Sequence, residues 1–359
     1  MVESTHTSFE QLLCCPRDRK PVKLHETPQR TRLMCPDGHA YPVIDGIPVM
    51  LLEESEHTLW VAKASLDAAR AAPPAEGSLE ALRLDTLGIT PEQRSSLERL
   101  ITKGSPIDPV AAMLVGATNG ILYENLVGAI SRYPIPELRL PDAPPNSPPD
   151  TNGTWLLDVG CNWGRWSIAA ARKGYNVVGI DPSLGALLAA RRVARSLGLS
   201  PHFVCADARQ LPFRSAAFSA AFSYSVLQHF SKNDARQALR SIRSVMQPGA
   251  TVLVQMPNWI GVRCLYHQAR RKFRRANGFE VRYWTTRKLR NTFDTIFGTS
   301  QLETDCFFGL GLQASDKDLM SGPAAALIET SEVLRGVTQR VPWLSELADS
   351  VYLRARVTN

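Results

Sequence analysis

A short apolar run that breaks into a glycine-rich turn carries the residues best suited to hold a ligand. The run contains one acid, and the turn follows it directly: Asp158, Gly160, Cys161, Asn162 and Gly164. Residues 165–172 continue with the spacing of a helix. Strand, glycine-rich turn and helix form the opening unit of a doubly wound α/β fold. Glycine lets the backbone approach a ligand closely, so we expect this turn to lie against a cofactor.

Two further acids follow the next strands. Asp181 closes the apolar run 176–180, and Asp207 follows the run 201–205. Ligands of doubly wound sheets bind outside the carboxyl ends of the strands, where these acids are expected. Asp181 lies about 20 residues after Gly160, a suitable distance for an acid that accepts both ribose hydroxyls. Asp207 is suited to accept a hydrogen bond from an adenine amino group.

The glycine spacing argues against a dinucleotide. The turn reads Gly160-x-Asn162-x-Gly164 rather than the dinucleotide fingerprint, and an acid at Asp158 would repel a pyrophosphate. The same acid suits the ammonium group of a methionine moiety. Asn162 tolerates a positive φ better than most residues, so the turn can form without a third glycine.

In order, these elements resemble the class I S-adenosylmethionine-dependent methyltransferases, type 11-like, over residues 155–257. The resemblance includes Asp-Ala-x-x-Leu-Pro-Phe at 207–213 and Met-Gln-Pro-Gly at 246–249. It differs in Asn162, where the family usually has glycine. The resemblance implies S-adenosyl-L-methionine as cofactor. The expected cofactor-binding residues are Asp158, Gly160, Cys161, Asn162, Gly164, Asp181, Pro182, Asp207, Ala208 and Ser225.

The chain is long enough for more than one domain, with 359 residues and 44% apolar composition. We expect a Rossmann-like, seven-stranded, mostly parallel α/β sheet with helices on both faces over 154–359. Before it we expect a small β-rich module at 9–55, a helical lid or support at 56–133 and a proline-rich connector at 134–153. Tyr123, in the helical block, is expected to pack rather than to reach the cofactor.

The module at 9–55 resembles the zinc-ribbon-like domain of the methyltransferase-activator family. The resemblance rests on Leu-x-Cys-Pro near its start and on Tyr-Pro-x-x-Asp-Gly-Ile-Pro at 41–48. Zinc ribbons use two Cys-x-x-Cys-like pairs, and both pairs are incomplete here. We therefore expect no zinc. The residues that could build a site are Cys15, Asp18, Cys35 and His39.

Residues near the ends of later strands indicate which kind of molecule could accept the methyl group. Val-Leu-x-His at 226–229 resembles a segment of the same methyltransferase family, so His229 is a candidate base, although local packing would explain it equally well. Between 263 and 290 lie ten Lys or Arg residues and one acid, so the net charge of +7 is a local feature. Apolar residues share the helical pattern of 262–276 with arginines.

We therefore expect methyl transfer to a small or carrier-linked acceptor, such as a lipid, sugar or natural product, with anionic character. An alternative is an RNA or protein methyltransferase with a built-in activator, and a second is a non-catalytic cofactor-binding scaffold. RNA is less favoured because the charge is confined to one block. Segment 262–276 could also contact an anionic membrane. The polar N-terminus and seven unpatterned cysteines favour a cytoplasmic protein, free or peripheral to a membrane.

Overall fold

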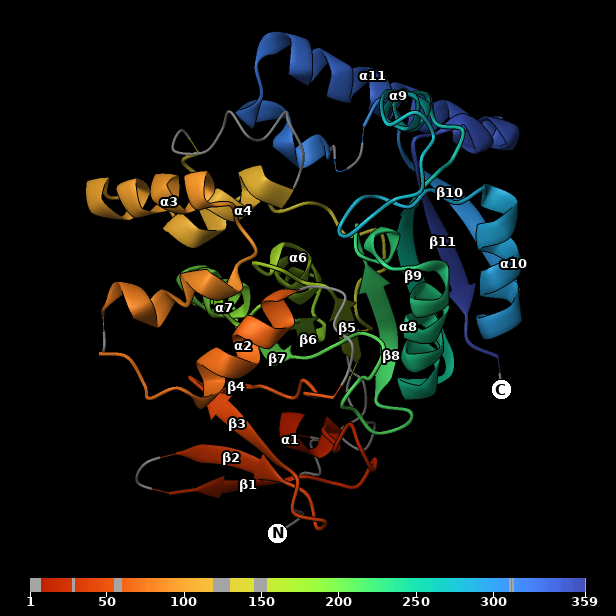
Figure 1. Cartoon of the computed structure of the whole chain (residues 1–359). Coiled ribbons are helices and arrows are strands. Elements are labelled where there is room, and N and C mark those ends of the chain that lie inside the picture. Colours follow the sequence, from red (N-terminus) through yellow and green to blue (C-terminus); the bar gives the residue numbers. More distant parts are fainter. Residues whose placement is uncertain are drawn as a thin grey trace.

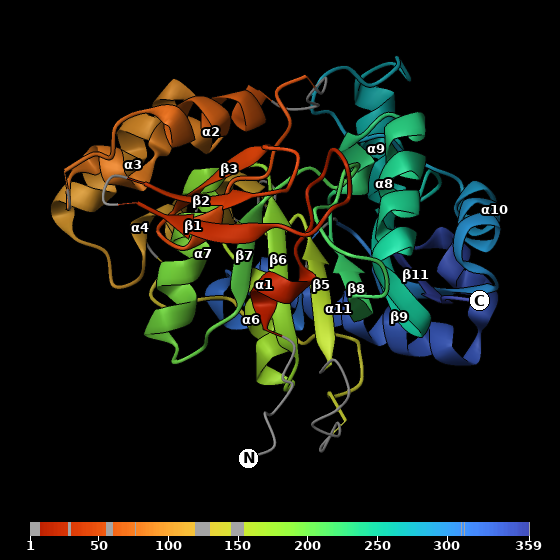
Figure 2. The same ribbon diagram turned by 90° about the horizontal axis from the view of Figure 1, so that it is seen from below.

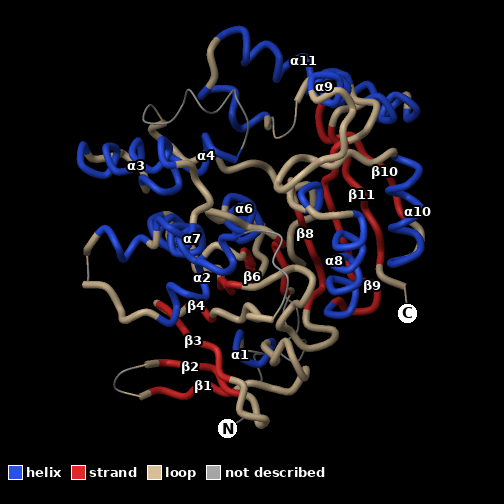
Figure 3. Tube along the Cα trace, in the orientation of Figure 1, coloured by secondary structure: helices blue, strands red, loops and turns tan. Residues whose placement is uncertain are grey.

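The computed structural model describes residues 8–27, 30–54, 60–75, 77–118, 130–144, 154–309, 311 and 313–358. Its centre is a seven-stranded sheet, and a smaller four-stranded sheet lies near the N-terminus (Figure 1). Figure 3 separates the two groups of strands from the helices that surround them. The expected α/β architecture with a β-rich module ahead of it is therefore confirmed.

The large sheet has the strand order β10-β11-β9-β8-β5-β6-β7. Five strands are parallel: β5 (Trp155–Val159), β6 (Asn176–Asp181), β7 (His202–Cys205), β8 (Phe218–Ser223) and β9 (Met246–Pro257). Two antiparallel strands close one edge: β10 (Ser300–Cys306) and β11 (Ser350–Arg356). Every residue of β5 is buried, as expected for a central parallel strand covered on both faces.

Helices cover both faces of the sheet. On one face lie α8 (Lys232–Val245) and α10 (Thr286–Phe297), whose apolar side chains join the largest core cluster. On the other lie α6 (Arg165–Arg172) and α7 (Leu184–Ser196), which follow β5 and β6 in the chain. Ser183 caps α7 and Ser231 caps α8 through their hydroxyl groups. After β9 the chain forms α9 (Val262–Arg270), and after β10 it forms α11 (Gly322–Arg340).

The N-terminal module packs directly on the large sheet. It consists of α1 (Phe9–Leu12), β1 (Lys23–Glu26), β2 (Thr31–Met34), β3 (Ala40–Ile44) and β4 (Ile47–Pro48). Just beyond β4, Val49 pairs in parallel with Cys205, and the Met50 amide donates to the Cys205 carbonyl at 2.8 Å. This contact places the module at the β7 edge, as Figures 1 and 2 show from two sides. Its apolar residues continue the core of the sheet.

The helical segment between module and sheet comprises α2 (Trp60–Arg70), the 3₁₀ turns η1 (Leu79–Leu82) and η2 (Leu84–Thr86), α3 (Pro91–Lys103) and α4 (Pro109–Thr118). Thr90 caps α3 in a capping box, as its Thr-Pro-Glu-Gln sequence predicts. The segment packs on α7 through α4 and η2. Residues 119–129, including Tyr123, and the connector residues 145–153 lie outside the described residues.

The first part of the proline-rich connector belongs to the core. Leu138 and Leu140 are buried against α6 and β5. The Tyr175 hydroxyl donates to the Pro141 carbonyl at 3.0 Å, and the Ala143 amide donates to the Lys173 carbonyl at 2.9 Å. Residues 134–144 therefore form part of the packing of the large sheet as well as a link to it.

Candidate cofactor and acceptor site

The glycine-rich turn and the acid after β6 meet at the carboxyl edge of the sheet. Gly160 and Cys161 both donate their amides to the Ile180 carbonyl, at 2.8 and 2.9 Å. The Asn162 amide donates to the Asp181 carboxylate at 3.1 Å. Gly160 has φ +76° and Asn162 has φ +49°, the left-handed conformation that the sequence requires of this turn. The structure therefore brings Asp158, Asn162 and Asp181 into one site.

Neither acid in this site is in an ordinary aqueous environment. Asp158 is 1% exposed, and Ser167 Oγ donates to it at 2.7 Å. Burial raises the pKa of Asp158 to about 7, while the Ser167 hydrogen bond opposes the rise. Burial raises the pKa of Asp181 to about 6, opposed by the amides of Ser183 and Asn162. Because burial disfavours the ionised forms of both carboxyls, a nearby cation would stabilise them. Two such carboxyls at the edge of the sheet therefore indicate a candidate binding site for a cationic ligand.

The other predicted residues near the turn pack against neighbouring elements or form backbone hydrogen bonds. Cys161 is 3% exposed and packs among apolar residues of α7 and β7, and burial raises the pKa of its thiol. A side chain at Gly164 would contact Ala190 at 2.9 Å, so glycine allows the turn to lie against α7. The Pro182 carbonyl accepts hydrogen bonds from Ser65 Oγ at 2.8 Å and from the Cys205 thiol at 3.4 Å. Ser65 thereby ties helix α2 to this loop.

The acid after β7 contacts an arginine. Arg209 donates to Asp207 through its backbone amide at 2.8 Å and through Nη2 at 2.7 Å, and it also pairs with Asp234 at 3.3 Å. Ala208 beside it is buried. The role of Asp207 toward an adenine amino group stays a prediction, and Arg209 is the residue that orients its carboxylate. Nothing in the local sequence distinguishes Arg209 from a surface arginine.

Ser225 follows β8 with φ +62°, and a glutamine on the next strand fixes it. The Ser225 amide donates to Gln255 Oε1 at 2.7 Å, and Gln255 Nε2 donates to Ser350 Oγ at 2.6 Å. Gln228 Nε2 donates to Ser225 Oγ at 2.8 Å. The backbone of this loop is therefore held by buried side chains of β9 and β11.

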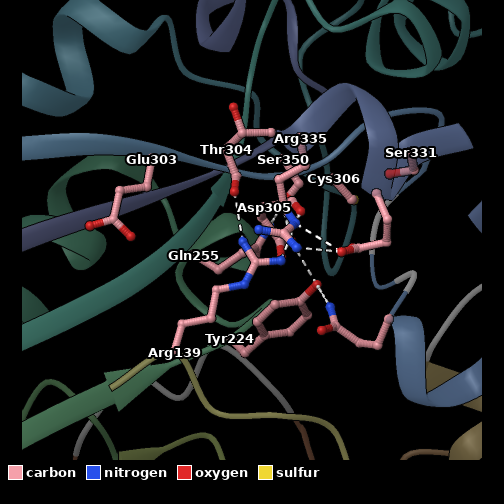
Figure 4. Close-up of polar contacts among 12 residues, drawn as sticks. Arg139, Tyr224, Gln255, Glu303, Thr304, Asp305, Cys306, Ser331, Arg335 and Ser350 are labelled. Carbon is pink, nitrogen blue, oxygen red and sulfur yellow. Dashed lines mark hydrogen bonds and ion pairs between the residues drawn. The ribbon is translucent and has the colours of Figure 1, made fainter. Parts of the chain in front are cut away.

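A buried aspartate lies at the centre of the same network (Figure 4). Asp305 is fully buried and accepts from the Tyr224 hydroxyl at 2.8 Å and from Ser350 Oγ at 2.7 Å. Arg139 Nη2 lies 3.8 Å from its other carboxylate oxygen. Gln313 Nε2 donates to the Tyr224 hydroxyl at 2.8 Å. Sequence reasoning missed Asp305 because its partners Arg139, Tyr224 and Ser350 come from three separated segments with no common motif.

His229 lies in the turn after β8, as expected, but its ring is tightly held. Its Nδ1 donates to the Phe279 carbonyl at 2.7 Å, so Nε2 carries the lone pair and accepts from Gln228 Nε2 at 3.2 Å. The ring also stacks on Phe279 with centroids 3.8 Å apart. Burial lowers the pKa of His229 to about 4, so its imidazole is neutral near pH 7. Its role as a base stays a prediction.

The four candidate metal ligands of the N-terminal module do converge. Their donor atoms all lie within 4.8 Å of one another. His39 Nδ1 is 3.4 Å from Cys15 Sγ and 3.3 Å from Cys35 Sγ, and Asp18 Oδ2 is 3.1 Å from His39 Nδ1. The edges of a tetrahedral zinc site measure about 3.3–3.8 Å, given zinc–ligand bonds of about 2.0–2.3 Å. The residues therefore fit a zinc ion, although the expectation from sequence was a metal-free module.

Comparison with known proteins agrees with the geometry at the carboxyl edge. Residues 156–249 match the family model described as "Methyltransferase domain". Malonyl-[acyl-carrier protein] O-methyltransferase of Pseudescherichia vulneris is 37% identical over 97 residues, which are 27% of this chain and 36% of that protein. Ubiquinone biosynthesis O-methyltransferase of Rhizobium etli is 28% identical over 114 residues, 32% of this chain and 45% of that protein. The chain thus spans less than half the length of these curated relatives.

Among solved structures, phosphoethanolamine N-methyltransferase 2 of Haemonchus contortus, in complex with S-adenosyl-L-methionine, is 16% identical. The match covers 58% of this chain and 49% of that one, with a TM-score of 0.39.

Proposed function

We propose that residues 156–249, which match the methyltransferase-domain model, form a class I S-adenosylmethionine-dependent methyltransferase domain. On this proposal the chain transfers a methyl group from that cofactor to an oxygen of a small or carrier-linked acceptor. The observation that carries the proposal is the hydrogen bond from the Asn162 amide to Asp181, which joins the glycine-rich turn to the acid after β6. An oxygen acceptor is supported by the names of the two curated relatives, both O-methyltransferases. An anionic acceptor is favoured by the basic block after β9.

The residues of this chain would bind the cofactor and orient the acceptor; they would not need to activate the methyl group. When bound, S-adenosylmethionine supplies a methyl group that its sulfonium already activates. Asp181 is suited to accept the ribose hydroxyls, and Asp158 supplies a negative charge for the methionine end. A side chain at Gly160 would meet Val226 at 2.2 Å, so glycine allows the loop after β8 to pack against the turn. Holding the acceptor close to the methyl then lowers the barrier by proximity and orientation.

His229 is the candidate group for the acceptor proton. Its tautomer leaves the lone pair on Nε2, to which Gln228 Nε2 donates, and its neutral state near pH 7 allows it to take a proton when that hydrogen bond is released. The lowered pKa makes His229 a weak base, so a carboxylic acid, which is already ionised near pH 7, suits the site better than a phenol. An acceptor that is already ionised would need His229 only for positioning.

Two other functions are tested by the same experiment. An RNA or protein methyltransferase is the second candidate, because the module at the β7 edge resembles an activator domain and packs on the catalytic sheet. A non-catalytic scaffold is the third. We suggest incubating the protein with methyl-labelled cofactor and separate lipid, acidic small-molecule, RNA and protein fractions. Label in the lipid or acidic small-molecule fraction supports our proposal, and label in the RNA or protein fraction supports the second candidate.

Asp181→Ala tests the site assignment in this assay. We expect it to abolish labelling and cofactor binding, whereas Asp142→Ala should change neither. Asp142 is a suitable control because its side chain is 78% exposed and pairs only with Lys173 among the described ion pairs. Cofactor binding at normal affinity in Asp181→Ala would refute the assignment. Binding without labelling of any fraction would favour the scaffold.

A further inference from the structure

Helix α9 and the loop after it expose apolar and basic side chains together. Six large apolar residues of this stretch are between 38% and 64% exposed: Trp259, Ile260, Val262, Leu265, Tyr266 and Phe273. Phe279 at its end is 56% exposed. We call residues 259–279 the α9 surface. Scattered exposed apolar residues are ordinary, but a run of this density on one short segment marks an interaction surface.

The apolar residues point outward because polar groups hold the inner side of the helix. The amides of Arg263 and Cys264 donate to Asp349 Oδ1 at 2.7 and 3.0 Å. Cys264 and Gln268 are each 1% exposed, and Gln268 Nε2 donates to the Trp259 carbonyl at 2.9 Å. The buried face of α9 thus fixes the orientation of the helix. Rotating α9 to bring its apolar side chains inward would break these hydrogen bonds.

The charge of the α9 surface has one sign. Residues 259–279 contain no Asp or Glu. Arg270, Lys272, Arg274 and Arg275 are exposed, and of these Arg274 pairs with Glu280 just beyond the surface. Exposed aromatic and aliphatic groups beside uncompensated cations are the pattern of an element that lies in the interface of an anionic bilayer. Nucleic acid would use the cations and the aromatic rings, but it offers little to Ile260, Val262 and Leu265.

We propose that the α9 surface docks on an anionic lipid bilayer, with its apolar side chains at headgroup depth and its basic side chains against lipid phosphates. Among the described residues, no helix has the length and apolar character needed to span a bilayer. The surface ends next to the candidate acceptor site. Phe279 stacks on His229 and holds its Nδ1, and Arg282 donates to the His229 carbonyl at 2.7 Å. Docking therefore brings the site to the lipid surface.

The proposal is independent of methyl transfer and is tested by binding alone. The full chain is sedimented with vesicles of phosphatidylcholine, with and without phosphatidylglycerol, and its affinity for a single-stranded RNA is measured in parallel. We expect binding to the phosphatidylglycerol vesicles and its loss at high salt. Equal binding to both kinds of vesicle, or binding to RNA but not to vesicles, would overturn the proposal.

Two sets of variants separate the charge from the apolar contribution. Each Lys or Arg near an anionic surface contributes about fivefold in partitioning, so losing three costs on the order of 100-fold. The triple variant Arg270→Glu, Lys272→Glu and Arg275→Glu also adds three acids, so its binding should weaken by at least that factor. The double variant Leu265→Ser and Tyr266→Ser should lose on the order of 10-fold or more, with circular dichroism unchanged.

A matched control lies on the far helices. Trp60, on α2, is 60% exposed, and Arg99, on α3, is also exposed. The variant Trp60→Ser with Arg99→Glu should bind vesicles as the unaltered protein does. A comparable loss in this control would show that binding does not depend on the α9 surface and would refute the proposal.

Discussion

The raised pKa values of Asp158 and Asp181 predict that cofactor affinity depends strongly on pH. A cationic ligand, or one that donates hydrogen bonds to a carboxylate, binds the ionised acid. Asp158, with a pKa of about 7, is about 1% ionised at pH 5, which weakens apparent binding about 100-fold relative to alkaline pH. Asp181, with a pKa of about 6, adds about 10-fold. The dissociation constant of S-adenosylmethionine, measured by calorimetry, should therefore fall steeply from about pH 5 to about pH 7.5.

Two variants identify the titrating groups. Asp158→Asn cannot ionise, so it should bind weakly and keep only the roughly 10-fold dependence due to Asp181. Ser167→Ala removes the hydroxyl that donates to Asp158 at 2.7 Å and favours its charged form, so the midpoint should move to higher pH. Affinity that does not change over this range, or an unaltered slope in Asp158→Asn, would refute the reasoning.

In the absence of cofactor, the stability of the protein should change with pH in the opposite direction to the cofactor affinity. An acid whose pKa is raised on folding binds its proton more tightly when folded, so stability falls as pH rises from about 4, its unfolded value, to about 7. For Asp158 the shift corresponds to about 4 kcal/mol. The difference in unfolding free energy between the unaltered protein and Asp158→Asn is measured in urea. It should decrease by about 4 kcal/mol between about pH 4 and about pH 7. A constant difference would contradict the burial that raises the pKa.

Three further outcomes are expected. Asp305→Ala should lower the unfolding free energy by about 3 kcal/mol, measured in urea, because Tyr224 and its neighbours lose their buried acceptor, whereas Asp305→Asn should cost less. Metal analysis should find about one zinc per chain, lost in Cys35→Ser but kept in Cys14→Ser, a buried cysteine outside the donor cluster; absence of zinc from both the unaltered protein and a zinc-reconstituted sample would contradict this. His229→Gln should reduce kcat about 100-fold with cofactor affinity unchanged, and full activity would exclude it as the base.

The sequence alone determined the elements whose signals are local. The strand, turn and helix around Gly160, the acid at Asp181 and the cap at Thr90 all depend on residues within a few positions of one another. Short apolar runs located the seven strands of the large sheet for the same reason. The left-handed Asn162 also follows from residue type, since few other residues with a side chain adopt that conformation readily.

Only the tertiary structure decided what depends on contacts between distant segments. Spacing gave two incomplete metal-binding pairs, and folding of the small sheet brought Cys15 and His39 to 3.4 Å. The buried network around Asp305 joins residues from 139 to 350, which no local pattern links. The helical spacing of 262–276 showed an amphipathic element but not which side faces solvent. Asp349 settled that by accepting the backbone amides of Arg263 and Cys264 at the start of α9, because a buried carboxylate must be hydrogen-bonded.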